Sequence, residues 1–297
     1  MSGIVTVKDE ERWVDAAIRW DDHAEEEVED APFDPFAEDR KQKFCFSFPL
    51  SITDDTTEQL LQVAGNSDGS ASASASKSIV ADPDNTIDVI TIELFGYTHD
   101  SDETFNSTGL TLWRAAEHLC HYMIKTSSTL QKKRILELGC GLGLNGILAH
   151  KLLTEESSTS TVYLTDGDTD AMAQLRDNVK HNISQSCSSN IPIRCNQLIW
   201  GREKTTTFLE KHCDNNKFDV LLASDVVYVG EIIEPLIESV TVLLSNDGVF
   251  LFAYCSKRNV PVKVEMVLDA ATTAGLMHEC VEEVDGIMIY SFRWKVV

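Results

Sequence analysis

Three glycines at alternate positions, Gly139, Gly141 and Gly143, follow the short apolar run Ile135–Leu138. The run has the length of a buried strand, and an apolar pattern with helical spacing begins directly after the glycines. A strand that turns through glycines into a helix brings bare backbone close to a ligand, beside the positive end of a helix dipole. The spacing Gly141-x-Gly143-x-x-Gly146 also matches the dinucleotide-binding pattern. An ordinary tight turn is an equally good interpretation of the glycines alone, so a second feature has to support a ligand.

An acidic residue, Glu137, lies two positions before the first glycine, near the C-terminal end of the predicted strand. A parallel strand that is buried on both faces should be apolar at such a place. The carboxylate therefore suggests a cationic group nearby, such as the amino group of an amino-acid moiety. S-adenosylmethionine (SAM) carries such a group and NAD does not, so Glu137 favours SAM as the ligand.

Polar or aromatic residues also follow three further apolar segments. Asp166 ends the predicted strand 161–165, about twenty residues past the glycine turn, where a carboxylate can accept hydrogen bonds from ribose hydroxyls. The others are Trp200 after the strand 191–199, and Ser224, Asp225 and Tyr228 after the strand 218–223. Ligands of open α/β sheets bind outside the carboxyl ends of the strands, so we expect all of these residues at one rim.

Two of these residues have competing interpretations. Asp225 follows an apolar run, has no partner near it in the sequence, and lies too far upstream to cap the next helix well. We therefore predict that its carboxylate is free for a functional role. Trp200 closes a strand, where tryptophan usually packs in the core, and core packing and adenine stacking are equal alternatives. Trp113 lies near the start of a predicted helix, where core packing is the ordinary role.

Strands and helices alternate from Arg134 onward, which indicates a parallel sheet covered by helices on both faces. Apolar residues with helical spacing predict helices over 109–125, from about 169, from 232 and from 264, the second with Asp168 as N-cap. The segments 277–284 and 287–294 can pair as a hairpin through Asp285-Gly286. The predicted fold is therefore α/β and Rossmann-like, with a C-terminal antiparallel hairpin that a plain dinucleotide domain lacks.

The chain divides into three predicted segments. Residues 1–43 are acidic and are predicted to be disordered, because their composition buries little apolar area. Residues 44–108 contain two alternating strands, 44–50 and 87–95, which form an N-terminal β-hairpin around the low-complexity loop 65–78. Residues 109–297 form the α/β domain.

Composition narrows the partners and the compartment. The net charge of −23 argues against binding to nucleic acids or anionic membranes and favours a basic partner. No secretory signal and no apolar run long enough to span a membrane are evident. Eight scattered cysteines without a C-x-x-C pair indicate reduced thiols, and His118 and His121 lack further metal ligands. We expect a monomer in the cytoplasm or also the nucleus, without a metal site.

Five motifs in order resemble methyltransferase family 16, a family dominated by protein-lysine methyltransferases. The motifs are Thr108–Ala116, Ile135–Gly143, Leu164–Asp168, Leu198–Gly201 and Ser224–Tyr228. The resemblance covers roughly 109–297 and implies a seven-strand class I methyltransferase sheet with SAM as the cofactor. It implies a donor site formed by Trp113, Glu137, Gly139, Gly141, Gly143, Asp166, Trp200 and Ser224. It also implies that the D-x-x-Y motif Asp225–Tyr228 lies at the target amine.

The resemblance predicts methyl transfer to a lysine side chain of a protein substrate. Asp225 would capture and orient the amine, and Tyr228 would wall the slot and attract the ammonium through its ring face. A methyltransferase acting on a small molecule or on protein histidine is one alternative. A non-catalytic interaction module of the same fold is another, and a NAD-dependent dehydrogenase is a more distant one.

Overall fold

A computed structural model describes residues 41–50, 88–154, 159–184, 191–258 and 260–295. The predicted extension 1–43, apart from its last three residues, and the loop 65–78 lie outside the described residues. The contacts divide the chain into one unit of Met1–Cys45 with Ile92–Val297 and a second unit of Phe46–Thr91. Among the described helices, none has both the length and the apolar character needed to cross a bilayer.

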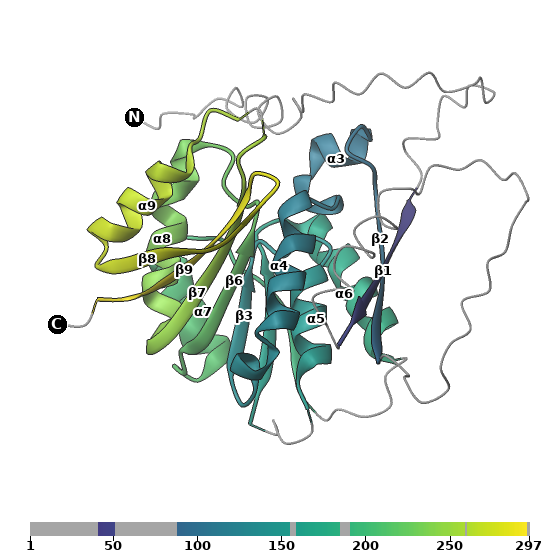
Figure 1. Ribbon diagram of the computed structural model, residues 1–297, viewed down its shortest axis with the longest axis horizontal. Coiled ribbons are helices and arrows are strands. Elements are labelled where there is room, and N and C mark those ends of the chain that lie inside the picture. Colours follow the sequence, from purple (N-terminus) through teal and green to yellow (C-terminus); the bar gives the residue numbers. More distant parts are fainter. Residues whose placement is uncertain (1–40, 51–87, 155–158, 185–190, 259, 296–297) are drawn as a thin grey trace, which may run out of the picture. The chain divides into compact units, whose positions relative to one another are not determined.

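The described elements alternate as the sequence predicts (Figure 1). The strands are β1 (Gln42–Pro49), β2 (Val89–Gly96), β3 (Arg134–Leu138), β4 (Thr161–Asp166), β5 (Ile193–Gln197), β6 (Phe218–Ser224), β7 (Leu244–Cys255), β8 (Leu276–Val284) and β9 (Ile287–Trp294). The helices are α3 (Asp102–Asn106), α4 (Arg114–Lys125), α5 (Leu144–Leu152), α6 (Thr169–Ser184), α7 (Arg202–Cys213), α8 (Ile233–Leu243) and α9 (Val264–Thr273), with short 3-10 turns η1 (Thr108–Leu110), η2 (Ser127–Leu130) and η4 (Gly230–Ile232).

Seven strands form one sheet with the order β5-β4-β3-β6-β7-β9-β8. Strands β3 to β7 are parallel to one another, whereas β9 pairs antiparallel with both β7 and β8. The chain winds outward from β3 in one direction and then from β6 in the other, so the order reverses between these two strands. Such a switch point is where α/β sheets bind ligands. The predicted Rossmann-like sheet with a C-terminal antiparallel hairpin is confirmed.

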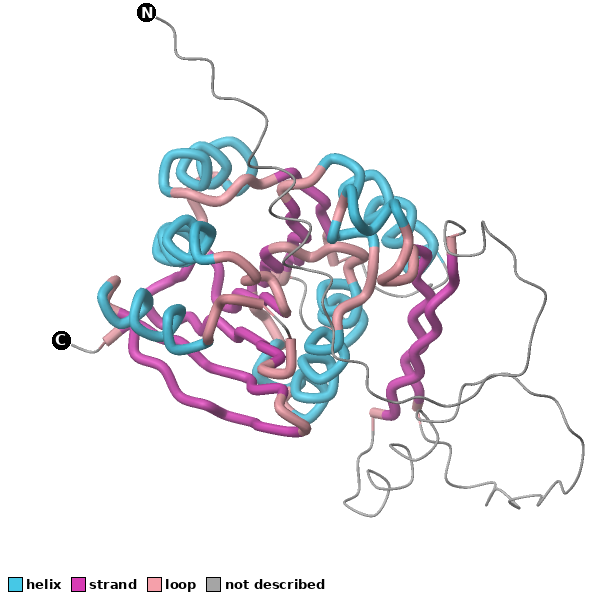
Figure 2. Tube along the Cα trace, turned by 90° about the horizontal axis from the view of Figure 1, so that it is seen from above, coloured by secondary structure: helices cyan, strands magenta, loops and turns pink. Residues whose placement is uncertain are grey.

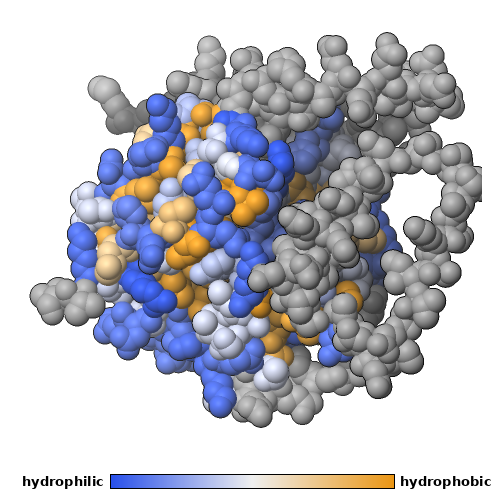
Figure 3. Space-filling model, viewed as in Figure 1, coloured by the Kyte–Doolittle hydropathy of each residue, from blue (hydrophilic) through white to orange (hydrophobic). Residues whose placement is uncertain are grey.

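Helices cover both faces of this sheet (Figure 2). Helix α4 packs beside α5, and α8 packs between α7 and α9. The central strands β3 and β6 are therefore buried along almost their whole length, as their continuous apolar sequences predict. At the antiparallel end, Phe250 of β7 and Phe292 of β9 stack with ring centroids 5.4 Å apart. On the outer surface that Figure 3 shows, hydrophilic side chains are interspersed with scattered hydrophobic ones.

Two local turns follow the sequence prediction closely. Asp285 and Gly286 have φ of 53° and 76°, the left-handed pair that a two-residue type I′ hairpin requires. Asp168 caps α6, because its Oδ1 accepts hydrogen bonds from the backbone N–H of Asp170 at 2.7 Å and of Ala171 at 3.0 Å. Both predictions are confirmed.

Three of the described helices differ from the prediction, and one of them is the short helix α3, which was not predicted. The helix predicted over 109–125 begins only at Arg114, because Thr108–Leu110 forms a separate 3-10 turn and Trp113 is extended as the N-cap. Helix α7 was not predicted at all. It buries only Thr205, Phe208, Leu209 and Cys213, so its sequence lacks a wide apolar stripe.

Strands β1 and β2 pair as a separate two-stranded sheet, close to the predicted ranges 44–50 and 87–95. Two asparagines of α6, Asn178 and Asn182, bond the end of β2. The side chain of Asn182 pairs with both backbone groups of Glu93, and that of Asn178 pairs with both backbone groups of Phe95. One turn of helix thus holds alternate residues of this strand as a neighbouring strand would.

Candidate active site

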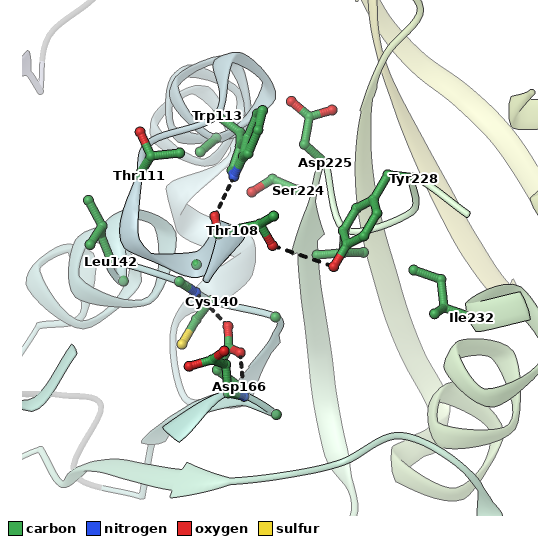
Figure 4. A pocket seen from close by; sticks show the side chains of 18 of the residues that line it. Thr108, Thr111, Trp113, Cys140, Leu142, Asp166, Ser224, Asp225, Tyr228 and Ile232 are labelled. Carbon is green, nitrogen blue, oxygen red and sulfur yellow. Dashed lines mark hydrogen bonds between the residues drawn. The ribbon is translucent and has the colours of Figure 1, made fainter. Parts of the chain in front are cut away.

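A cavity of about 480 Å³ lies at the carboxyl ends of β3, β4 and β6, at the switch point of the sheet. Figure 4 shows side chains from separate loops converging on it. Its lining comes from the segments 108–113, 139–145, 166–168, 198–200, 224–228 and 231–235. All of the predicted site residues except Glu137 line this cavity. Their roles in binding stay predictions.

The glycine turn is held by close backbone approach as well as by its dihedral angles. Gly139 has φ of 64°, and a Cβ there would lie 2.7 Å from Cγ1 of Val226. Gly141 has φ of 48°, and a Cβ there would lie 3.0 Å from the carbonyl oxygen of Gly109. Both positions therefore exclude a side chain, for conformational and steric reasons together. The contact with Gly109 ties the turn to the loop that carries Thr108.

Glu137 lies behind the glycine turn and does not line the cavity, contrary to the prediction that it meets a ligand. Glu137 is only 1% exposed. Oε1 accepts a hydrogen bond from Nδ2 of Asn145 at 3.0 Å, and Oε2 accepts one from the backbone N–H of Gly146 at 2.8 Å. The sequence predicted a cationic group beside this acid, but its two hydrogen-bond donors are neutral and belong to helix α5. The carboxyl group thus bonds the start of α5, the helix that follows the glycine turn.

Burial raises the pKa of Glu137 from 4.5 to about 8, although its two hydrogen-bond donors act in the opposite direction. At neutral pH the folded chain then holds a proton that the unfolded chain releases. This contribution to stability is fully present below pH 4.5 and is lost as the pH rises toward about 8. We expect wild type to lose unfolding free energy relative to Glu137→Gln over this window, by up to about 1.4 kcal/mol per pH unit.

Urea unfolding of both proteins at several pH values between about 5 and 8.5 measures this difference. Groups other than Glu137 cancel in the comparison because they are present in both proteins. A difference that stays constant across the window would show that Glu137 is ionised in the folded chain.

Asp166 ends β4, is partly buried and lines the cavity. Its Oδ2 accepts a hydrogen bond from the backbone N–H of Gly141 at 2.9 Å, and its Oδ1 accepts one from Asp168 N–H at 3.0 Å. Each carboxylate oxygen can accept further hydrogen bonds. Asp166 therefore joins the glycine turn to β4 and can still serve ribose hydroxyls.

Trp113 and Tyr228 approach the cavity from different elements and meet at Thr108. The indole Nε1 of Trp113 donates to the carbonyl oxygen of Thr108 at 2.9 Å, and the Thr108 and Tyr228 hydroxyl oxygens are 3.4 Å apart (Figure 4). Burial raises the pKa of Tyr228, so its hydroxyl stays neutral at physiological pH. The three residues form a connected wall between the donor side and the β6 side of the cavity.

Trp200 is partly buried, and the structure shows the core packing that was one of the two roles left open by the sequence. Its ring packs against the hydrophobic core, and it also lines the cavity next to the glycine turn. A Cβ on Gly139 would lie 3.2 Å from Cζ2 of Trp200, so the ring lies close to that backbone. Stacking on an adenine stays a prediction.

The prediction that the Asp225 carboxylate is free is wrong. The side chain is 0% exposed and is enclosed by three donors. Oδ2 accepts a hydrogen bond from Ala115 N–H at 3.0 Å, Oδ1 accepts one from Cys255 N–H at 3.0 Å, and Nε of Arg258 lies 3.3 Å from Oδ1. Figure 4 shows the carboxylate pointing away from Asp166 and from the Tyr228 hydroxyl. Asp225 thus caps the first turn of α4 across the fold, and its carboxylate is not available to an incoming amine.

Two residues of this site were missed from the sequence. Asn145 donates from Nδ2 to both Glu137 and Ser224, each at 3.0 Å, and so joins the ends of β3 and β6. The signal was a polar residue at a helix start that is otherwise apolar. Arg258 is buried after β7 and bonds the segment that begins at Asp225. Nothing in its local sequence distinguishes it from a surface arginine.

A family model described as lysine methyltransferase matches residues 99–264 of this chain. The protein-lysine N-methyltransferase EFM3 of Chaetomium thermophilum is 32% identical over 154 residues, which is 52% of this chain and 44% of that protein. The protein N-lysine methyltransferase METTL21A of Xenopus tropicalis is 32% identical over 142 residues, 48% of this chain and 58% of its own. The chain spans about half the length of these curated relatives.

EFM6 of Saccharomyces cerevisiae, also named as a protein-lysine N-methyltransferase, is 32% identical over 163 residues, 50% of this chain and 63% of its own. Among solved structures, the magnesium protoporphyrin IX methyltransferase of Synechocystis aligns with a TM-score of 0.43 at 14% identity. That alignment covers 64% of this chain and 94% of the other.

Proposed function

Since the chain belongs to the lysine methyltransferase family, we propose that it transfers a methyl group from SAM to the side-chain amine of a lysine in a protein. The observation that carries the proposal is the cavity at the switch point of the sheet. The glycine turn and Asp166 form one side of it, and Tyr228 and Glu231 form the other. A donor and an acceptor can therefore meet inside one enclosure.

The donor side fits SAM in size and in chemistry. A volume of about 480 Å³ lies within the range of small-molecule sites, roughly 300–1,000 Å³. Asp166 would hold the ribose hydroxyls, and the bare backbone of Gly139 and Gly141 admits a ligand at the start of α5. Trp113 and Trp200 supply flat apolar surfaces that suit an adenine and the donor's sulfonium region.

SAM supplies an activated methyl group, so that the amine nitrogen forms a bond to carbon as the carbon–sulfur bond breaks and the electron pair leaves with sulfur. The residues of the chain then have to position a neutral amine. A free lysine has a pKa near 10.4, so only about one amine in 2,500 is neutral at pH 7. Burial beside the Tyr228 ring disfavours the ammonium and raises the neutral fraction. The neutral Tyr228 hydroxyl can accept a hydrogen bond from the amine, which helps to orient its lone pair.

With Asp225 enclosed, Glu231 is the acid that lines the cavity on the same loop as Tyr228. It is exposed in the 3-10 turn Gly230–Ile232 and forms no ion pair with another described residue. Its carboxylate can attract the ammonium before the amine loses its proton, a role that was predicted for Asp225. The overall charge of −23 suits a substrate with a basic surface.

Glu231→Gln should raise KM for the protein substrate about two- to fivefold, because an exposed ion pair contributes about 0.2–1 kcal/mol. Turnover and SAM affinity should change little. Steady-state kinetics at low and high salt measures both the effect and its screening. Glu234→Gln is the matched control, since Glu234 is equally exposed on the next turn but does not line the cavity. Equal effects of the two variants would remove Glu231 from the acceptor site.

The proposal extends to the compartment and the assembly. The seven cysteines in the described part of the chain are all free thiols, which supports a reducing compartment, the cytoplasm or also the nucleus. A monomer as the active form, as expected from the sequence, stays part of the proposal.

The proposed function is tested by incubating the purified protein and methyl-labelled SAM with a cell lysate. We expect a labelled protein band, suppressed by excess S-adenosylhomocysteine, whose digest carries the label on lysine. Label on histidine, or only on a small molecule, would overturn the lysine assignment. Calorimetry that finds no SAM binding to the folded protein would leave a non-catalytic module, and NAD binding in its place would indicate a dehydrogenase.

A further inference from the structure

Arg258 is a buried cation that follows β7, and its two terminal nitrogens both donate to the backbone segment that begins at Asp225. Nη1 donates to the carbonyl oxygen of Asp225 at 3.0 Å, and Nη2 donates to that of Val227 at 2.9 Å. Nε donates to the carbonyl oxygen of Cys255 at 3.2 Å, and Cζ lies 4.8 Å from the centroid of the Tyr254 ring. The guanidinium therefore fixes the backbone of residues 225–227 and does not line the cavity.

The segment that Arg258 holds begins in an uncommon backbone conformation. Asp225 has φ of 54°, in the left-handed region that aspartate and asparagine enter more readily than other residues with a Cβ. The turn persists because Asp225 is fixed through its carbonyl by Arg258 and through its carboxylate by Ala115, Cys255 and the same arginine. Asp225 and Arg258 together thus fix the direction in which the chain leaves β6.

This direction decides where Tyr228 lies. The carbonyl bonded by Nη2 of Arg258 belongs to Val227, the residue directly before the tyrosine. At the other end, the Tyr228 hydroxyl meets Thr108 across the cavity. The tyrosine is therefore held on its backbone side by Arg258 and at its tip by Thr108.

We propose that Arg258 is a positioning residue for methyl transfer, which acts by holding Asp225–Val227 so that the Tyr228 ring faces the acceptor amine. The proposal rests on the proposed function and deepens it. The planar guanidinium is required because one side chain has to bond two carbonyls and pair with a carboxylate at once, which a lysine ammonium on a flexible stem does not reproduce.

The first test is a double-mutant cycle on turnover with the protein substrate found by labelling. Arg258→Lys keeps a cation beside Asp225 but loses the bidentate bonding, so turnover should fall about tenfold or more while KM for SAM stays within about threefold. In a Tyr228→Ala background, the same change should lower turnover by less than about twofold. A loss of equal size in both backgrounds would overturn the proposal, because Arg258 would then act on folding and not through Tyr228.

The second test does not depend on methylation. In protein with ring-labelled tyrosine, the resonance of Tyr228 is assigned by its loss in Tyr228→Phe, and its titration reports the pKa that burial raises above 10.0. In Arg258→Lys this pKa should move down toward 10.0 as the ring becomes more exposed. The control is Arg202→Lys, a surface arginine with a side chain 63% exposed, which should leave the Tyr228 resonance unchanged.

An unchanged Tyr228 titration in folded Arg258→Lys would overturn the proposal whether or not the chain methylates any lysine. If the Tyr228 pKa differs between wild type and Arg258→Lys as expected but wild type labels no protein, the positioning role holds and the proposed function fails. If Arg258→Lys does not fold, the neutral pair Asp225→Asn with Arg258→Met carries the same measurement, because it removes the buried charge together with its partner.

Discussion

Asp225→Ala is expected to lower the free energy of unfolding by about 3–5 kcal/mol, and turnover should fall with the loss of folded protein. The substitution removes one partner of an ion pair whose side chains are 4% and 0% exposed, so the Arg258 charge stays buried without compensation. The backbone N–H groups of Ala115 and Cys255 also lose their acceptor. Alanine tolerates the left-handed φ of this position poorly, which adds to the loss.

Urea unfolding followed by circular dichroism measures this effect. Asp225→Asn is the control, because asparagine tolerates left-handed backbone and keeps one carbonyl oxygen for a backbone donor. It should destabilise clearly less than Asp225→Ala. Wild-type stability in Asp225→Ala, together with a loss of turnover, would return Asp225 to the amine slot that the sequence first suggested.

The role of Asp225 could not be predicted from the sequence because its partners are distant along the chain. The partners of the carboxylate lie 110, 30 and 33 positions away, at Ala115, Cys255 and Arg258, and only the folded sheet brings them together. Features whose partners are close in sequence were predicted correctly. Asp168 caps its own helix two and three residues on, and Asp285-Gly286 forms its own turn, so both could be predicted.

Glu137 and helix α7 mark the two kinds of failure. For Glu137 the sequence predicted a cationic group of a ligand beside the buried acid, but neutral donors of the protein also satisfy a carboxyl group. The structure assigns them to Asn145 and Gly146. Helix α7 escaped prediction because a helix that rests on few apolar residues has no distinct period. The overall sheet was predictable because continuous apolar strands and the hairpin dipeptide carry strong signals.

Gly141→Val is expected to weaken SAM binding at least about 100-fold, a loss of about 2.8 kcal/mol or more. The reason lies in the neighbouring backbone. At φ of 48° a Cβ would point toward Gly109, 3.0 Å from its carbonyl oxygen and 3.5 Å from its Cα. A β-branched side chain adds methyl groups to this contact and strongly resists a left-handed backbone. The turn and the Thr108–Leu110 loop would have to separate.

Separating the glycine turn from the Thr108–Leu110 loop would disturb the proposed SAM site in two ways. Gly141 N–H donates to Asp166, so a displaced turn withdraws a bond that orients the carboxylate proposed to hold the ribose. Thr108, next to Gly109, accepts from Trp113 and meets Tyr228, so a displaced loop loosens the opposite wall. Isothermal calorimetry with SAM and S-adenosylhomocysteine measures the loss directly. It needs no protein substrate, and it therefore remains informative before one is found.

Gly275→Val separates this local effect from general backbone strain. Gly275 has φ of 90° at the end of α9, away from the residues that line the cavity, and a Cβ there would meet only Trp294 at 4.0 Å. Both variants should lower the melting temperature, because both place a β-branched residue at positive φ. Only Gly141→Val should lose SAM affinity. Equal affinity in the two variants would mean that the turn at Gly141 can move away from Gly109 without cost to the donor site, and that the tight packing between the two loops serves stability alone.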